Sequence, residues 1–427
     1  MKLTKETILD KEGYRLHILP SKKYKTITIV AKFKAPLKRE GITERALLPH
    51  VLQKATSNHP NIRSLQSAFE NLYGTALSSD GSKKGENHVI SFRMEVVNEA
   101  YLNDEEPILE EALKLFHEVL FDPKKEGDGF DTDIVKREKQ TLEQKITSIK
   151  DDKMSYANLR LMDNMCKDEP YALHVHGYLE DFKDITPESL YSYYEQMIKG
   201  DMLDVYVIGD IPSKDVESLT SRFFTRKNSD NSDNDQVSVS KQVEEVSEIV
   251  EKEEVKQGKL HLGYRTYTKF GEDDYYALQI FNGIYGGFPS SKLFMNVREK
   301  HSLAYYAASR FESHKGLLLV FSGVDPKDYK QAKSIILEQM DAMKAGDFTE
   351  QQVEETKEQV INQLQETMDN ANGLIEVLYH QMISGAEMPA DELIENIRKV
   401  TKDDVIKMAN KIELDTIYFL TSKDGGE

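Results

Sequence analysis

GIYGGFPSSKLFMNVREKHSLAYY, residues 283–306, carries the clearest structural signals in this sequence. An apolar helical pattern ends here, a Gly-Gly-Phe-Pro break follows, and a second helix begins at Ser290 or Ser291, either of which suits an N-cap. A breaker at His301-Ser302 then leads into a strand-like run over residues 303–309. The stretch therefore predicts a helix, a break, a second helix and a strand.

This arrangement places Arg298 near the end of the second helix and Tyr305 on the strand that follows. A guanidinium and a phenol placed in this way can converge on one point, where they could hold a peptide carbonyl or a carboxylate. On local pattern alone, a surface Arg and a half-buried Tyr are the commoner outcome.

Composition favours a two-domain globular protein. The chain has 427 residues, of which 39% are hydrophobic and 30% charged. The net charge of -18 argues against a nucleic-acid partner and favours cationic peptides, although acidic surfaces more often serve solubility.

Cys166 is the only cysteine, so neither an internal disulfide nor a cysteine zinc site is expected. No apolar run suits a membrane span or signal peptide, which predicts a cytoplasmic protein without a membrane partner.

The pattern of elements predicts an α+β fold of two duplicated domains, each an antiparallel or mixed β-sheet packed against helices. We expect an N-terminal domain over residues 1–228, a linker over 229–256 and a C-terminal domain over 257–427. The polar run SDNSDNDQVSVS, residues 229–240, marks the linker. Both halves end in a helix and a strand, with Thr186 and Thr401 as equivalent N-caps, which indicates duplication.

The chain resembles the pitrilysin and mitochondrial-processing-peptidase family, the inverted-motif zinc peptidases, over nearly its whole length. The most specific segments are KLFMNVREKHSLAYY, residues 292–306, and residues 169–210, which look like the family's substrate-holding segment and domain ending. The resemblance implies that Arg298 and Tyr305 bind substrate. It also puts Gly283, Gly286 and Gly287 at a glycine-containing loop implicated in substrate handling, although a helix break explains these glycines equally well.

The zinc motif of the family, His-x-x-Glu-His on a helix, is degenerate here. Aligning ERALLPHVLQKAT, residues 44–56, puts Ala46 at the first His and Pro49 at the Glu, and keeps only His50. Pro49 should also kink this helix.

On the later helix, predicted as one long helix or a pair over residues 132–165, Glu138 matches an acidic residue of the family. Lys145 then occupies the position of the third ligand, uncertain by one helical turn, and its ammonium would repel zinc. His174 and His176 could supply substitute ligands, but alternate residues of a loop should point apart. We expect no metal in this chain.

In two-subunit members of the family, one chain keeps the zinc motif and the other supplies the Arg and Tyr. This chain resembles the second kind, in particular the inactive-motif members of Gram-positive bacteria. The resemblance implies a heterodimer with a zinc-motif homologue that binds the zinc and cleaves the peptide. Two alternatives remain: a structural or peptide-binding protein without peptidase activity in any complex, and an active peptidase with improvised ligands.

Overall fold

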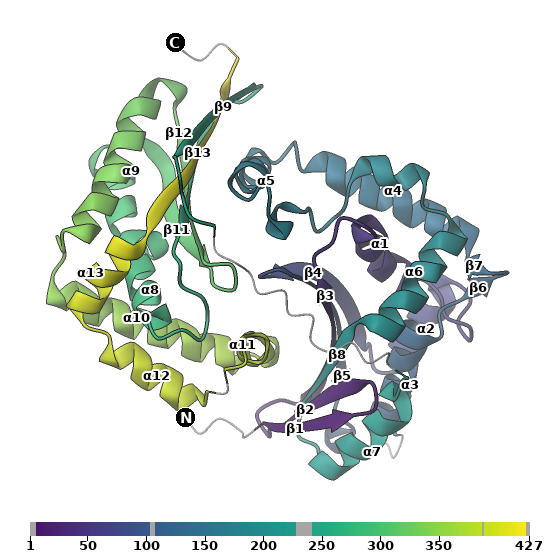
Figure 1. The fold of residues 1–427 in the computed structure, drawn as a ribbon. Coiled ribbons are helices and arrows are strands. Elements are labelled where there is room, and N and C mark those ends of the chain that lie inside the picture. Colours follow the sequence, from purple (N-terminus) through teal and green to yellow (C-terminus); the bar gives the residue numbers. More distant parts are fainter. Residues whose placement is uncertain (1–5, 103–106, 228–240, 387, 424–427) are drawn as a thin grey trace. The chain divides into compact units, whose positions relative to one another are not determined.

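Two β-sheets with matching strand orders form the framework of the chain (Figure 1). The computed structural model describes residues 6–102, 107–227, 241–386 and 388–423. The chain forms two compact units, one comprising Met1–Ser148 and Leu173–Gln236 and the other Ile149–Ala172 and Val237–Glu427. The first unit therefore contains the zinc-motif positions, and the second contains the segment with Arg298 and Tyr305.

The first unit is built on a six-stranded sheet in the order β1-β2-β8-β3-β5-β4. β2 and β8 are parallel, and the other neighbouring strands are antiparallel. The strands are β1 (Thr7–Lys11), β2 (Tyr14–Pro20), β3 (Thr26–Pro36), β4 (Ala76–Lys84), β5 (Asn87–Val97) and β8 (Met202–Gly209). A small separate hairpin consists of β6 (Lys125–Glu126) and β7 (Gly129–Phe130).

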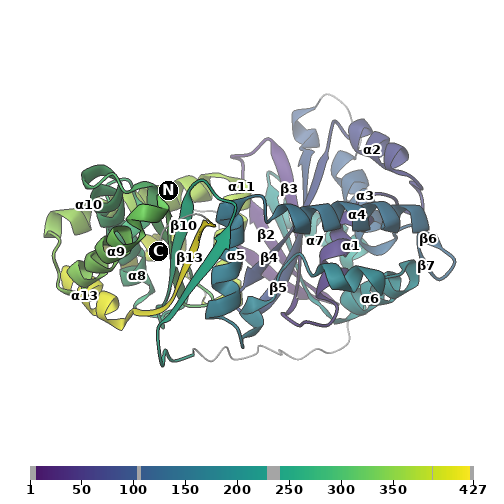
Figure 2. The same ribbon diagram turned by 90° about the horizontal axis from the view of Figure 1, so that it is seen from above.

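Helices cover one face of this sheet, as Figures 1 and 2 show. The alternating apolar side chains of its strands are buried in the core of this unit. On β3, for example, Ile29, Ala31 and Phe33 enter this core at every second position. The helices are α1 (Ile42–Leu52), α2 (Ile62–Asn71), α3 (Ile108–Phe121), α4 (Thr132–Ser148), α6 (Pro187–Gly200) and α7 (Ser213–Phe224).

The second unit has a five-stranded sheet in the order β11-β12-β10-β13-β9, with only β9 and β13 parallel. The strands are β9 (Ser247–Glu253), β10 (Gly258–Arg265), β11 (Ala304–Glu312), β12 (Leu317–Val324) and β13 (Glu413–Ser422). The helices are α5 (Lys153–Met165), α8 (Tyr275–Asn282), α9 (Tyr329–Lys344), α10 (Glu350–Asp369), α11 (Ala371–Ser384), α12 (Ala390–Lys399) and α13 (Lys402–Lys411).

The two units share one topology, which confirms the predicted duplication. The first sheet has one additional strand, β1. If the other five strands of each sheet are counted along the chain, both sheets have the order first, fifth, second, fourth, third, and the first and fifth strands are parallel. Thr186 and Thr401 both form capping boxes, at the starts of α6 and α13, and each helix leads into the fifth strand. The predicted fold class, two α+β domains of mixed sheets packed against helices, is confirmed.

The unit boundaries differ from those expected in one segment, residues 149–172. Residues 132–165, predicted as one long helix or a pair, form the pair, and α4 belongs to the first unit and α5 to the second. α5 packs on the face of the second sheet opposite α8, α9 and α13 (Figures 1 and 2). It buries Ala157, Leu161 and Met165 there. The second unit is therefore assembled from two separate stretches of chain.

The expected linker is partly a strand. Residues 228–240 lie outside the described residues, but Ser247–Glu253, within the predicted linker, forms the edge strand β9. The prediction was wrong here because the charged residues of this stretch suggested a linker. Exposed edge strands also commonly carry charges, which discourage pairing with other chains. Among the described residues, no helix is long and apolar enough to span a bilayer.

Candidate functional site

The stretch 283–306 forms two π-helical segments, Gly283–Gly287 and Phe294–Lys300, followed by β11. Such widened turns are rare and often occur at functional sites. The glycine segment is helical rather than a loop, and it is buried except at Gly287. A Cβ atom on Gly286 would lie 2.5 Å from Ser309 Oγ and 2.7 Å from Ser309 N, so glycine is needed for close packing against β11.

The second helix begins and ends as the sequence indicates. The Ser291 hydroxyl accepts a hydrogen bond from Phe294 N at 3.4 Å, which places the N-cap at Ser291. At the other end, Ser302 adopts the left-handed conformation with a φ of 52°. Ser302 N donates to Arg298 O, the bond of an αL C-cap, and Leu303 N donates to Val297 O, both at 3.0 Å. This turn links the last helical turn, with Arg298, to the strand with Tyr305.

Arg298 and Tyr305 are both exposed. The Arg298 side chain is 44% exposed, and its guanidinium carbon lies 4.6 Å from the centre of the Phe294 ring, while its Nε is 3.6 Å from Glu299 Oε1. Tyr305 is 82% exposed, an unusual value for an aromatic residue on a strand. The sequence-based alternative, a half-buried Tyr305, is therefore wrong.

Tyr305 and Tyr306 occupy an irregularity in the edge strand β11. Ala304 pairs with Val324 and Ala307 with Ser322, so three steps on β11 match two on β12. Tyr306 is half-buried, and the Lys259 ammonium lies 5.4 Å from the centre of its ring. Burial, with the nearby charge of Asp152, raises the pKa of Tyr306 to about 12, so its hydroxyl stays protonated and can donate a hydrogen bond.

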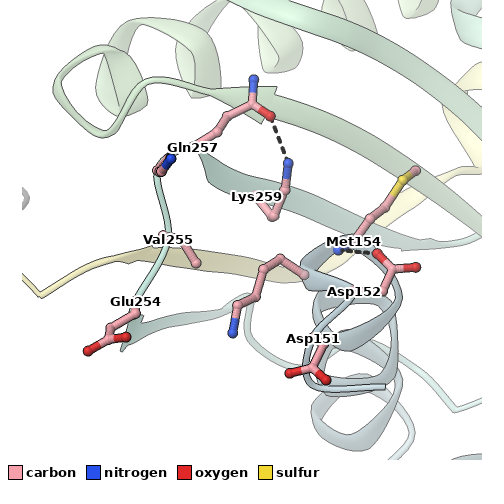
Figure 3. Close-up of a pocket in the computed structure, with 9 residues that line it drawn as sticks. Asp151, Asp152, Met154, Glu254, Val255, Gln257 and Lys259 are labelled. Carbon is pink, nitrogen blue, oxygen red and sulfur yellow. Dashed lines mark hydrogen bonds between the residues drawn. The ribbon is translucent and has the colours of Figure 1, made fainter. Parts of the chain in front are cut away.

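Lys259 also lines a cavity of about 320 Å³ in the second unit, shown in Figure 3. The cavity lies between the start of α5 and the turn that joins β9 to β10. Lys259 Nζ donates to Gln257 Oε1 at 2.7 Å, and Asp152 caps α5 by accepting from Met154 N at 3.1 Å. Sequence reasoning missed this cavity, because its residues come from stretches about one hundred positions apart in the chain.

The degenerate zinc motif lies on α1 of the first unit. Pro49 is inside the helix and buried, and α1 nevertheless continues to Leu52. Ala46 and His50 are half-buried. Burial and the charges of Lys145 and Lys54 lower the pKa of His50, so its imidazole is neutral at pH 7.

α4 packs against α1 and carries the two remaining motif positions. Glu138 is buried, and its carboxylate lies 3.5 Å from Lys54 Nζ. Lys145 is exposed on the same helix, yet its charge acts on both His50 and His176. The positive charge of Lys145 therefore acts on both histidines, and the predicted assignment of Lys145 to the third-ligand position stays a prediction.

His176 joins this cluster from the loop before α6. Burial and the charge of Lys145 lower the pKa of His176 to about 4, with smaller effects of His50 and His174. No group of three or more His, Cys, Asp or Glu residues in the described part of the chain is arranged to hold a metal ion. Two imidazoles beside an ammonium do not fit the ligand requirements of zinc.

Sequence comparison identifies a family and several similar proteins. A family model described as "Peptidase M16 inactive domain" matches residues 184–360. The chain is 49% identical over 413 residues, 97% of each chain, to a Bacillus subtilis protein named "Probable inactive metalloprotease YmfF". It is also 24% identical over 294 residues, 66% of this chain and 69% of the relative, to the "Uncharacterized zinc protease YmxG" of the same organism.

Solved structures show the same fold. A conserved protein from Enterococcus faecalis superposes with a TM-score of 0.91 at 32% identity, covering 99% of this chain and 100% of that one. A protease from Helicobacter pylori superposes with a TM-score of 0.79 at 17% identity, covering 98% and 100% of the two chains. At that lower identity the likeness concerns the fold alone.

Proposed function

Since this chain belongs to the M16 peptidase family and yet carries Ala46, Pro49 and Lys145 at its zinc-motif positions, we propose that it is a catalytically inactive, substrate-binding subunit of a heterodimeric zinc metallopeptidase. Its partner is a homologue with an intact zinc motif, which binds the zinc and cleaves the peptide. The pair acts in the cytoplasm, with neither nucleic acid nor membrane as a partner.

The exposure of Tyr305 is the observation that carries the proposal. An 82% exposed tyrosine on a strand contributes little to folding, so its ring and hydroxyl are available to a ligand. Arg298 reaches solvent from the adjoining helix end and is steadied by its contact with the Phe294 ring.

In this proposal Arg298 and Tyr305 bind the backbone of a peptide that lies in the partner's zinc site. The guanidinium donates to a peptide carbonyl, and the Tyr305 hydroxyl donates to the oxygen on which negative charge develops during hydrolysis. The groups that position the substrate and the groups that bind the metal can come from different polypeptides. Both act by lying at the right positions around the same bound peptide.

The test is reconstitution of this chain with a zinc-motif homologue from the same organism. Arg298→Ala should abolish peptide cleavage while the complex still assembles, as measured by size-exclusion chromatography. Tyr305→Phe should reduce the turnover number more than it weakens peptide binding, because it removes a bond made mainly in the transition state. Arg310→Ala, an exposed Arg on β11 in the same unit, is the matched control and should cleave normally.

Full cleavage by the Arg298→Ala complex would contradict the proposed role of Arg298 in binding the peptide. Peptide binding that depends on Arg298, without cleavage in any reconstituted pair, would instead support a peptide-binding protein that takes no part in proteolysis. Elemental analysis addresses the other alternative: we expect essentially no zinc in the isolated chain, whereas improvised ligands would hold about one zinc per chain.

A further inference from the structure

The edge strand β9 of the second unit is open on one side. It pairs in parallel with β13, and no other strand in the described part of the chain pairs with it. An edge strand presents a row of backbone N–H and C=O groups that can pair with a further strand. Charged side chains on the edge hinder most strands but favour a strand whose charges match them. Which strand can pair here therefore depends on the side chains of β9.

The side chains on one face of β9 already have partners within the second unit. The Glu251 carboxylate lies 3.0 Å from Arg160 Nε, and it accepts a hydrogen bond from the Tyr156 hydroxyl at 2.6 Å. Glu253 pairs with Lys150 Nζ at 2.6 Å. These carboxylates are therefore neutralised by the cations of residues 149–172 and of α5.

The opposite face of β9 is exposed and carries an apolar residue between two opposite charges. Glu248, Val250 and Lys252 lie on this face, because side chains alternate along a strand. Val250 is 51% exposed, and the Glu248 side chain is 42% exposed although it pairs with Lys333 Nζ at 2.8 Å. Lys252 is exposed, and its ammonium has no ion pair among the described residues. The two charges lie at equal distances along the strand on either side of Val250.

This pattern is self-complementary when two copies of the strand run antiparallel. If a two-fold axis passes between the two Val250 residues, these valines face each other. Glu248 of each copy then lies opposite Lys252 of the other copy, so two pairs of opposite charge form on the exposed face. Opposite charges that face each other across an antiparallel pair are stabilising.

The neighbouring registers lack this match. Side chains that face each other must lie on the same face of the sheet, so the axis can move only from one residue to the next. With the axis at Ile249, Lys252 would lie opposite Val246 and no opposite charges would meet. With the axis at Glu251, the two Glu251 carboxylates would face each other, which is destabilising. The side chains therefore favour the register centred on Val250.

We propose that β9 is a homodimer interface, at which two copies of this chain pair their β9 strands antiparallel about Val250. The pairing joins the two five-stranded sheets into one continuous sheet. A two-fold interface between identical strands closes the assembly at two copies. This interface requires neither Arg298 and Tyr305 nor a zinc-motif partner, so it and the proposed function can fail separately.

Disulfide trapping in the full chain tests the register. Val250→Cys puts two cysteines opposite each other, so mild oxidation should link the chains into dimers on a non-reducing gel. Val246→Cys, at a position that is 44% exposed, is the matched control. In the proposed register Val246 lies opposite Glu254 and far from Val246 of the second copy, so this variant should stay unlinked. The native Cys166 is buried and should form no link.

Sedimentation velocity measures the dimer of the unmodified chain, which should form at micromolar concentration. Lys252→Glu should raise the dissociation constant about tenfold or more, because the new carboxylate faces Glu248 of the other copy. Lys214→Glu, an exposed Lys on α7, is the matched control and should dimerise like the parent. Glu248→Lys should also weaken the dimer. A mixture of Glu248→Lys with Lys252→Glu should form dimers again, because opposite charges then meet.

A parent chain that stays monomeric at micromolar concentration would overturn the proposal. So would equal dimerisation of Lys252→Glu and the parent, or equal linking of the two cysteine variants. Hydrogen exchange separates the other occupants of this edge. Protection of the β9 amides in a monomer would show that another part of the chain covers the strand. Protection that appears only when a zinc-motif homologue is added would assign the edge to that protein, and either result would also overturn the proposal.

Discussion

Buried Arg265 and half-buried Glu169 form a bidentate ion pair, with 2.7 Å between Nη2 and Oε1 and 3.2 Å between Nη1 and Oε2. Arg265 Nη2 also donates to Met165 O at 2.7 Å, and Lys315 Nζ lies 2.6 Å from Glu169 Oε2. The Arg265–Glu169 ion pair connects residues 149–172, which come from the first half of the chain, to the sheet of the second unit. Its position explains why α5 belongs to that unit.

Glu169→Gln should loosen this attachment. The change deprives the buried cations of Arg265 and Lys315 of the Glu169 carboxylate, and removing one partner of a buried pair typically costs about 3–5 kcal/mol. Hydrogen exchange should therefore rise over α5 more than over α4. Glu366→Gln, at an exposed site on α10, should leave both helices unchanged, and equal protection of α5 in both variants would contradict the prediction.

Protonation of His17 should make the first unit more stable in mild acid. His17 is buried between Glu6, 2.7 Å from Nδ1, and Asp204, 3.2 Å from Nε2. Burial opposes protonation, but the hydrogen bonds to Asp204 and Glu6 outweigh it and raise the pKa above 6.5. The stabilisation is fully present below pH 6.5 and is lost as the pH rises through the raised value.

Denaturant unfolding at a series of pH values checks this effect. The stability of the parent chain should fall with rising pH in that window. His17→Gln should flatten the dependence, and an identical slope in the variant would show that another group is responsible.

Lys145→Gln should raise the pKa values of both His50 and His176. The ammonium of Lys145 lowers both, so its removal leaves mainly the effect of burial. Titration of the histidine ring signals by NMR measures the shifts. Lys136→Gln, an exposed Lys on the same helix, should leave both pKa values in place. A lack of response in Lys145→Gln would place Lys145 away from the motif.

Restoring the motif should restore metal binding. The triple variant Ala46→His, Pro49→Glu and Lys145→Glu provides two imidazoles and a carboxylate for zinc, with a second carboxylate to polarise water. We expect the zinc content to rise from essentially none to nearly one per chain by elemental analysis. The double variant that retains Lys145 should bind far more weakly, because the ammonium opposes the cation. Equal zinc in both would reject Lys145 as the ligand position.

Ser302→Val should destabilise the segment with Arg298 and Tyr305. Ser302 is left-handed, and a β-branched side chain in that conformation costs about 1–2 kcal/mol. Thermal unfolding should show a lower midpoint for Ser302→Val, while Ser302→Gly should be tolerated because glycine adopts this conformation freely. In the reconstituted pair, Ser302→Val should also reduce cleavage, because the turn orients Arg298 relative to Tyr305.

The local elements of the candidate site follow closely from the sequence. The N-cap at Ser291, the break at Ser302 and the hairpin of β11 and β12 depend on residues within a few positions of one another. Neighbouring positions in the chain set cap, turn and strand geometry, so a single sequence contains the information. The same holds for the duplication, since both capping threonines are visible in the chain.

What the sequence by itself determined is thus most of the elements, their duplication and the absence of a complete His-x-x-Glu-His motif around His50. The tertiary structure alone decided that α5 joins the second unit and that Tyr305 is exposed. Periodicity shows which face of an element is apolar but not which distant element covers it. Such contacts join residues far apart in the chain, and only the folded molecule brings them together.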